Sequence, residues 1–112
     1  MGAKPNPPPA RLVWVRSDGT DVPFELRPQP MLIGREEGAD IRLEEPLVSR
    51  GHARIEARGD GYVVLDLGST NLTKVNGAVV TECILRDGDE VRFGRARCTF
   101  VAQEGQRTPG GA

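Results

Sequence analysis

Short apolar runs that alternate with polar residues constrain this chain more than any other sequence feature. In a period-two pattern, alternate side chains lie on opposite faces of a β-strand. Such runs occur at positions 12–15, 22–26, 31–33, 41–43, 53–57, 62–65, 75–79, 84–85, 91–93 and 98–101. Turn residues separate them at intervals of about 8–12 residues, which is typical of β-sandwiches. The sequence therefore predicts an all-β, two-sheet sandwich of about eleven short strands.

Local sequence refines this prediction. No stretch repeats apolar residues with helical spacing over three turns, so we expect no substantial helix. Pro23 indicates an edge strand, because proline has no N–H to donate to a neighbouring strand. Asn76-Gly77 predicts a two-residue type I′ hairpin. The chain has 112 residues, which corresponds to one domain. We place this domain at residues 11–103, between a flexible Pro-rich leader (1–10) and a flexible Gly-rich tail (104–112).

Charge and cysteine content exclude several classes of protein. Fifteen Lys and Arg against sixteen Asp and Glu leave a net charge of −1, which argues against bulk attraction to nucleic acid or anionic lipid. No apolar run approaches the ~20 residues of a membrane helix. Cys83, Cys98 and the single histidine, His52, make a zinc site implausible, so we expect no metal and no cofactor. Reduced cysteines favour a cytoplasmic protein.

Three loops carry more polar chemistry than turns require. Gly34-Arg35 follows one predicted strand, and the segments 46–52 and 66–71 contain hydroxyl, amide and guanidinium groups. A bidentate arginine with several neutral donors suits a phosphate group. A metal would instead be bound by carboxylates or thiolates.

These motifs, in this order, identify a resemblance to a known family. The chain resembles the forkhead-associated (FHA) domain from about residue 12 to residue 102. The motifs that carry the resemblance are, in order, Gly34-Arg35, Ser49-Arg50-Gly51-His52, Gly68-Ser69-Thr70-Asn71 and Val75-Asn76-Gly77. The resemblance implies a non-catalytic, monomeric β-sandwich that binds phosphothreonine through loops at one end. Its partners would be substrates of a Ser/Thr kinase, or the kinase itself, so that the protein acts as a signalling adaptor.

The resemblance also assigns roles to individual residues, and these roles stay expectations of the family. The residues that would contact the phosphate are Arg35, Ser49, Arg50 and Thr70. Asn71 would hydrogen-bond the peptide backbone. The residues that would support the loops are Gly34, His52, Asn76 and Gly77.

One departure from the family pattern is Leu72, which stands where a second glycine is usual. If the position requires a positive φ, leucine costs about 1–2 kcal/mol. Leu72 and Leu47 also place apolar side chains beside the expected site. We therefore hypothesise that the preferred peptide has an apolar residue near the third position after the phosphothreonine.

Other interpretations of the same residues remain open. Ser49, His52 and Asp66 could form a hydrolase triad, although the serine lacks a nucleophile elbow. A single-strand nucleic-acid barrel would need exposed aromatics, of which the chain has few. A degenerate family member would bind protein without phosphate. Thr108 in the tail could itself be phosphorylated and dock on the domain.

Overall fold

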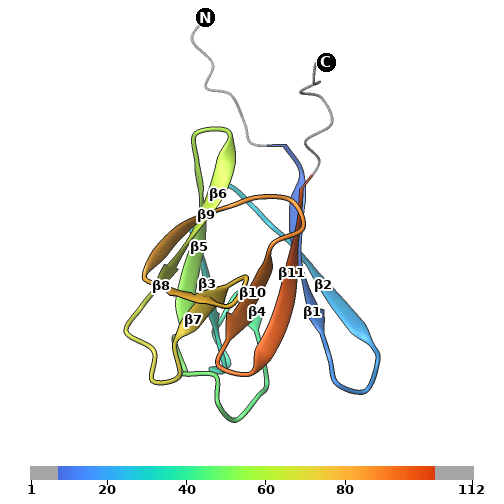
Figure 1. Cartoon of the computed structure of the whole chain (residues 1–112), viewed down its shortest axis with the longest axis vertical. Helices are drawn as coiled ribbons and strands as arrows, with labels where there is room; N and C mark the ends of the chain where they lie inside the picture. The colour runs from blue at the N-terminus through green and yellow to red at the C-terminus, as the bar shows by residue number, and fades with distance from the viewer. Residues whose placement is uncertain (1–7, 103–112) are drawn as a thin grey trace, which may run out of the picture.

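The computed structural model describes residues 8–102, which form eleven strands in two sheets packed face to face (Figure 1). The six-stranded sheet has the order β2 (Asp21–Glu25), β1 (Ala10–Val15), β11 (Ala96–Ala102), β10 (Glu90–Phe93), β7 (Thr73–Val75), β8 (Ala78–Val80). The five-stranded sheet has the order β4 (Ile41–Arg42), β3 (Met31–Gly34), β5 (Ala53–Arg58), β6 (Gly61–Asp66), β9 (Glu82–Leu85). The predicted all-β sandwich without a substantial helix is confirmed for these residues.

The core lies between the two sheets and is built from alternate residues of each strand. Leu12, Ile33, Val91 and Phe93 are fully buried. Four of the five aromatic side chains are buried, and Phe24 is half-buried against the same core. The described residues therefore offer no exposed aromatic surface on which bases could stack. They also contain no helix long and apolar enough to cross a membrane.

Two local predictions about strands are met by the structure. Pro23 lies on β2, an edge strand of the six-stranded sheet, and faces Val13 of β1. Asn76 and Gly77 have φ of 51° and 88°, and Val75 pairs with Ala78 across the turn. Positive φ at both central residues is what a type I′ hairpin requires.

The two ends of the sandwich differ in character. Ala10 pairs with Ala102, so β1 begins and β11 ends side by side at one end (top of Figure 1). We call the opposite end the apical end, because the connections after β3, β4, β6 and β10 meet there (bottom of Figure 1). The candidate residues lie in these connections, except for Gly34, which ends β3, and Asn76 and Gly77, which lie in the β7–β8 turn. The predicted leader and tail, including Thr108, fall largely outside the described residues.

Gly34 lets two apical connections approach each other closely. It ends β3, and its carbonyl accepts a hydrogen bond from the Leu43 N–H at 2.9 Å. A Cβ atom at this position would overlap the Arg50 carbonyl oxygen. Only glycine therefore lets the chain at Ser49-Arg50 lie directly on the end of β3.

Gly34→Ala is expected to lower the free energy of unfolding by about 1–3 kcal/mol, the usual cost of overpacking. Gly38→Ala is the matched control, because a Cβ there meets no heavy atom within 4 Å. Urea unfolding of both variants makes the comparison. Equal stabilities would show that the close approach at Gly34 is not a real constraint.

Candidate functional site

Arg35 is fixed at the apical end by the chain that crosses over Gly34. Its N–H donates to the Ser49 carbonyl at 3.0 Å, and its Nε donates to the Val48 carbonyl at 2.9 Å. Val48 is buried, so this carbonyl is held in place by the core. The guanidinium keeps both Nη groups free of protein partners among residues 8–102, and it is exposed. Arg35 is thus a rigidly held fork with its donors facing solvent.

Ser49 lies next to Arg35 and joins a second loop. Its Oγ accepts a hydrogen bond from the Thr70 N–H at 3.2 Å, which leaves the Ser49 hydroxyl proton available. Thr70 is exposed, and so is Arg50, which has no carboxylate partner among the described residues. The structure therefore brings together the four predicted phosphate contacts, Arg35, Ser49, Arg50 and Thr70.

His52 is buried beneath these loops and connects them. Its Nδ1 accepts a hydrogen bond from the Ser49 N–H at 3.1 Å, so the ring proton lies on Nε2, which donates to the Leu72 carbonyl at 2.9 Å. The ring also packs edge-on against Phe93, with centroids 5.6 Å apart. Burial lowers the pKa of His52, although the Leu72 carbonyl and Asp66 oppose that shift. A neutral imidazole thus holds two loops in one arrangement.

Asp66 organises the loop that carries Thr70 and Asn71. One carboxylate oxygen accepts from the Ser69 and Thr73 hydroxyls at 2.5 and 2.7 Å, and the other accepts from the Gly68 and Ser69 N–H groups at 2.9 and 3.0 Å. Burial acts to raise the pKa of Asp66, but these hydrogen bonds outweigh it and the pKa is lowered. The carboxylate therefore stays ionised and keeps the loop closed.

Asn71 precedes Leu72 and is hydrogen-bonded to Leu47, two of the three exposed leucines among residues 8–102. Its side-chain Nδ2 donates to the Leu47 carbonyl at 3.0 Å, which leaves the amide oxygen free to accept from a ligand. Leu47 and Leu72 are 40% and 43% exposed, so both side chains are available at the rim. Leu72 has φ of 72°, the left-handed region in which leucine costs about 1–2 kcal/mol.

Gly94 holds the turn between β10 and β11 against this part of the site. Its N–H donates to the Leu72 carbonyl at 3.1 Å, and its φ is 63°. A Cβ atom there would overlap the Leu47 carbonyl oxygen. The Leu72 carbonyl therefore accepts from both Gly94 and His52, which fixes the strained residue from two sides.

Asn76 and Gly77 lie away from the apical loops. The Asn76 side chain donates to Asp89 Oδ1 at 3.0 Å and accepts from the Glu90 N–H at 3.0 Å. Asn76 therefore ties the β7–β8 hairpin to the turn before β10. The structure does not bring it to the cluster around Arg35.

The hydrolase triad does not form. Both nitrogens of His52 are bound to backbone groups, at Ser49 N and Leu72 O, so neither is free to take a proton from the Ser49 hydroxyl. The Asp66 carboxylate is committed to its own loop. No group of three or more His, Cys, Asp or Glu side chains within residues 8–102 has the geometry to hold a metal ion.

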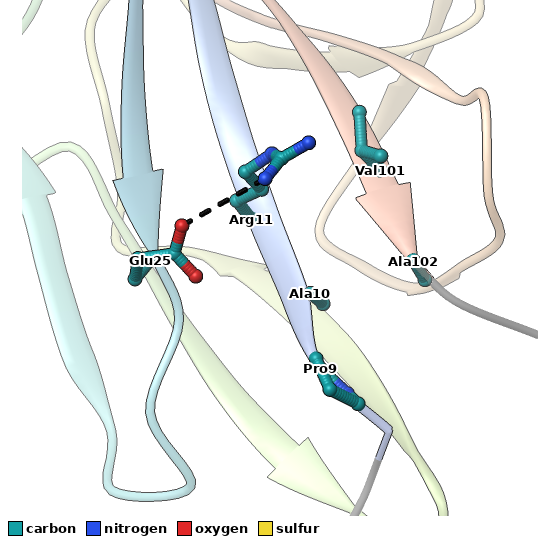
Figure 2. Close-up of a pocket in the computed structure, with 6 residues that line it drawn as sticks. All are labelled: Pro9, Ala10, Arg11, Glu25, Val101 and Ala102. Atoms are coloured by element: carbon teal, nitrogen blue, oxygen red, sulfur yellow. Dashed lines mark ion pairs between the residues drawn. The ribbon is translucent and has the colours of Figure 1, made fainter.

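A pocket of about 220 Å³ lies at the other end of the sandwich (Figure 2). Its lining residues are Pro9, Ala10, Arg11, Glu25, Val101 and Ala102. The two charged side chains that line it, Arg11 and Glu25, form an exposed ion pair at 3.9 Å. Its polar groups thus pair with each other, in contrast to the unpaired donors at the apical end.

Sequence reasoning missed two residues that build the site. Asp66 is the first: on sequence alone it is weighed only as a triad acid, whereas Asp66 before Gly68-Ser69 is a turn composition in which the aspartate side chain accepts from the following N–H groups. Gly94 is the second residue: it lies in the β10–β11 turn, but its contact is with Leu47, a residue far away in sequence. No local pattern shows that contact.

Comparisons with known proteins agree with this geometry. The family model described as FHA domain matches residues 31–94. The chain is 37% identical over 92 residues to the oxoglutarate dehydrogenase inhibitor of Corynebacterium jeikeium, covering 82% of this chain and 64% of that protein. It is 46% identical over 81 residues to the FHA domain-containing protein FhaA of Mycobacterium tuberculosis, covering 70% of this chain and 15% of FhaA. The chain thus spans less than two thirds of either relative.

A solved structure shows the same arrangement. A chain studied for phosphothreonine-dependent FHA domain interactions superimposes with a TM-score of 0.77 at 35% identity. The match covers 85% of this chain and 97% of that one. The sandwich therefore shares its fold with a solved FHA domain over most of its length.

The stability of the domain should fall as pH decreases through the unfolded-state pKa of histidine, about 6.5. Because the folded-state pKa of His52 is lowered, the unfolded chain binds more protons below that pH, and protonated Nδ1 no longer accepts from Ser49. Urea unfolding between about pH 7.5 and about pH 5.5 measures the effect.

His52 is the only histidine in the chain, so one variant supplies the control. His52→Gln should be less stable at neutral pH and nearly independent of pH over the same interval. An equal pH dependence in both proteins would assign the titration to another group.

Proposed function

Because the chain belongs to the FHA domain family, we propose that it is a non-catalytic module that binds phosphothreonine in partner proteins through its apical loops. One observation carries the proposal. The Arg35 guanidinium is fixed through Nε to the Val48 carbonyl and has no Nη partner among residues 8–102, while the Arg35 N–H is bound to the carbonyl of Ser49, whose hydroxyl proton is available. This is a preformed bidentate donor next to a neutral donor, as a phosphate monoester requires.

The proposed mechanism is recognition without chemistry. Arg35 and Ser49 donate to the phosphate oxygens, with Arg50 and Thr70 at the same rim. The free amide oxygen of Asn71 accepts from the peptide backbone, since its Nδ2 is already bound to Leu47. Because the loops are braced by His52 and Asp66 before any ligand arrives, little ordering entropy is lost on binding.

The similar proteins support this function and its setting. The solved FHA structure concerns phosphothreonine-dependent interactions, and one relative is named as an enzyme inhibitor. We propose accordingly that the partners are substrates of a Ser/Thr kinase, or the kinase itself, and that the module acts as a monomeric adaptor in the cytoplasm. Both cysteines are free thiols, which suits a reducing compartment.

A phosphate-independent protein-binding module is the second candidate. Leu72 is the observation that favours it, because it departs from the family glycine and holds a positive φ. With leucine at position 72, the hydrogen bonds of Arg35 and Ser49 are still present. We therefore prefer the phosphate-dependent function.

Leu47 and Leu72, the exposed leucines in contact with Asn71 or next to it, suggest a preference within the peptide. Leu47 and Leu72 flank Asn71, so a residue a few positions after the phosphothreonine would meet apolar side chains rather than charges. We propose that this residue is apolar, near the third position. A degenerate phosphothreonine library that enriched acidic residues there would contradict this preference.

Arg35→Ala is expected to weaken binding of a phosphothreonine peptide more than tenfold, because losing a hydrogen bond to a charged group costs roughly 1.5–3 kcal/mol. Fluorescence polarisation of a labelled peptide measures the affinity. Dephosphorylating the same peptide should cause a comparable loss.

Arg54→Ala is the matched control, since Arg54 is an exposed arginine on the outer face of β5, paired with Glu56 at 3.1 Å. It should bind as the wild type does. If Arg35→Ala also retains the wild-type affinity, the phosphate-independent function replaces the one proposed here.

Leu72→Gly is expected to stabilise the fold by up to about 1 kcal/mol, since glycine adopts a positive φ without strain. It should also weaken the preference for an apolar residue after the phosphothreonine. Leu67→Gly is the control, because Leu67 is 44% exposed but has no positive φ, so it should lose about 0.5–1 kcal/mol. Thermal unfolding and peptide titration test both effects, and a destabilised Leu72→Gly would refute the strain.

A further inference from the structure

Three basic side chains form a row across the outer face of the six-stranded sheet. Arg92 on β10 lies opposite Lys74 on β7 and opposite Arg97 on β11. Their neighbours in each strand point into the core, so these three side chains point outward. The buried neighbours are Thr73, Val75, Val91, Phe93, Ala96 and Cys98. We call Lys74, Arg92 and Arg97 the basic row.

The basic row is poorly compensated by the protein itself. Like charges directly opposite each other on neighbouring strands destabilise a sheet. One carboxylate oxygen, Glu90 Oε2, lies 3.4 Å from Arg92 Nε and 3.7 Å from Arg97 Nε. Lys74 has no acidic partner within the described part of the chain. Three positive charges therefore share one negative charge.

The outer face of the other sheet is arranged differently. There Arg54 pairs with Glu56 at 3.1 Å, and Arg58 pairs with both Glu56 and Glu82, at 3.4 and 2.6 Å. Charges on that face are matched, as is usual for a solvated surface. An unmatched row on one face only points to an anionic partner for that face.

The basic row is continuous with the apical site. Lys74 is the second residue of β7, which starts directly after Leu72. Arg92 and Arg97 form the second residue pair from the β10–β11 turn, after Phe93 and Ala96. That turn contacts Leu72 through Gly94. It also carries Arg95, which is exposed and without an acidic partner among residues 8–102. Positive charge thus extends from Leu72 onto the sheet.

We propose that the basic row binds an acidic segment of the same partner whose phosphothreonine occupies the apical loops. This proposal rests on the proposed function, which places the peptide beside Leu72. Charge complementarity selects an anionic segment, and continuity with the apical site makes it part of the same chain. A nucleic acid is disfavoured, because no exposed aromatic side chain accompanies the row and the net charge is −1.

The test compares two phosphothreonine peptides that differ only beyond the apolar position. One continues with four glutamates and the other with four glutamines. At low salt the wild type should bind the glutamate peptide about fivefold more tightly, the gain expected from two net charges at an exposed surface. The preference should shrink as salt is added, because screening weakens exposed charge pairs.

Lys74→Gln/Arg92→Gln/Arg97→Gln should bind both peptides equally, with the affinity of the wild type for the glutamine peptide. Arg54→Gln on the opposite face should keep the full preference. Lys74→Gln alone should melt no lower than the wild type, since it removes a like-charge contact, yet it should reduce the preference. If the basic row served stability alone, Lys74→Gln would melt lower than the wild type and keep the full preference for the glutamate peptide.

The outcomes separate this proposal from the function on which it rests. If neither peptide binds better than its unphosphorylated form, the proposed function fails. If both bind through the phosphate but with equal affinity, the acidic segment is refuted while the function stands. Displacement of the glutamate peptide by a single-stranded oligonucleotide at equal concentration would also overturn the proposal, in favour of a nucleic acid.

Discussion

The apical site depends on the buried, neutral ring of His52. One ring nitrogen accepts from the Ser49 N–H and the other donates to the Leu72 carbonyl. One side chain therefore joins the β4–β5 loop to the loop that crosses from β6 to β7 in the other sheet. Phe93 packs edge-on against the ring and fixes its orientation. Because burial keeps the ring uncharged, the contact has a defined donor and acceptor. This buried connection holds Ser49 against the loop that ends at Leu72, and the contacts of Arg35 and Asp66 are built around it.

The exposed groups are thereby separated from those that position them. Arg35, Ser49 and Asn71 each use one polar atom for the fold and leave another for a ligand. The glycines that permit this lie at close contacts, where Gly34 and Gly94 allow backbone carbonyls to come within reach. The net charge of −1 is therefore compatible with a local excess of positive charge at one end of the molecule.

The fold was predictable from sequence, because strands and tight turns leave local signals, and the sequence motifs also point to the apical loops in which Arg35, Ser49 and Thr70 lie. The alternation of apolar and polar residues predicts the strands. Pro23 predicts that its strand lies at a sheet edge, and Asn76-Gly77 predicts the β7–β8 hairpin. The hydrogen bond from Arg35 Nε to Val48 was not predictable, since it depends on how two loops cross. The basic row was missed for a related reason. Lys74, Arg92 and Arg97 become neighbours only through strand register, which the sequence does not encode locally.

Phosphate recognition by the apical loops is tested by backbone amide chemical shifts during titration with a phosphothreonine peptide. The perturbed amides should cluster at residues 35–36, 49–52 and 69–72, and the unphosphorylated peptide should leave them unchanged. Perturbations centred on the pocket between Pro9 and Ala102 would contradict it. So would equal shifts with and without the phosphate, because the free donors of Arg35 and Ser49 would then have no role in binding.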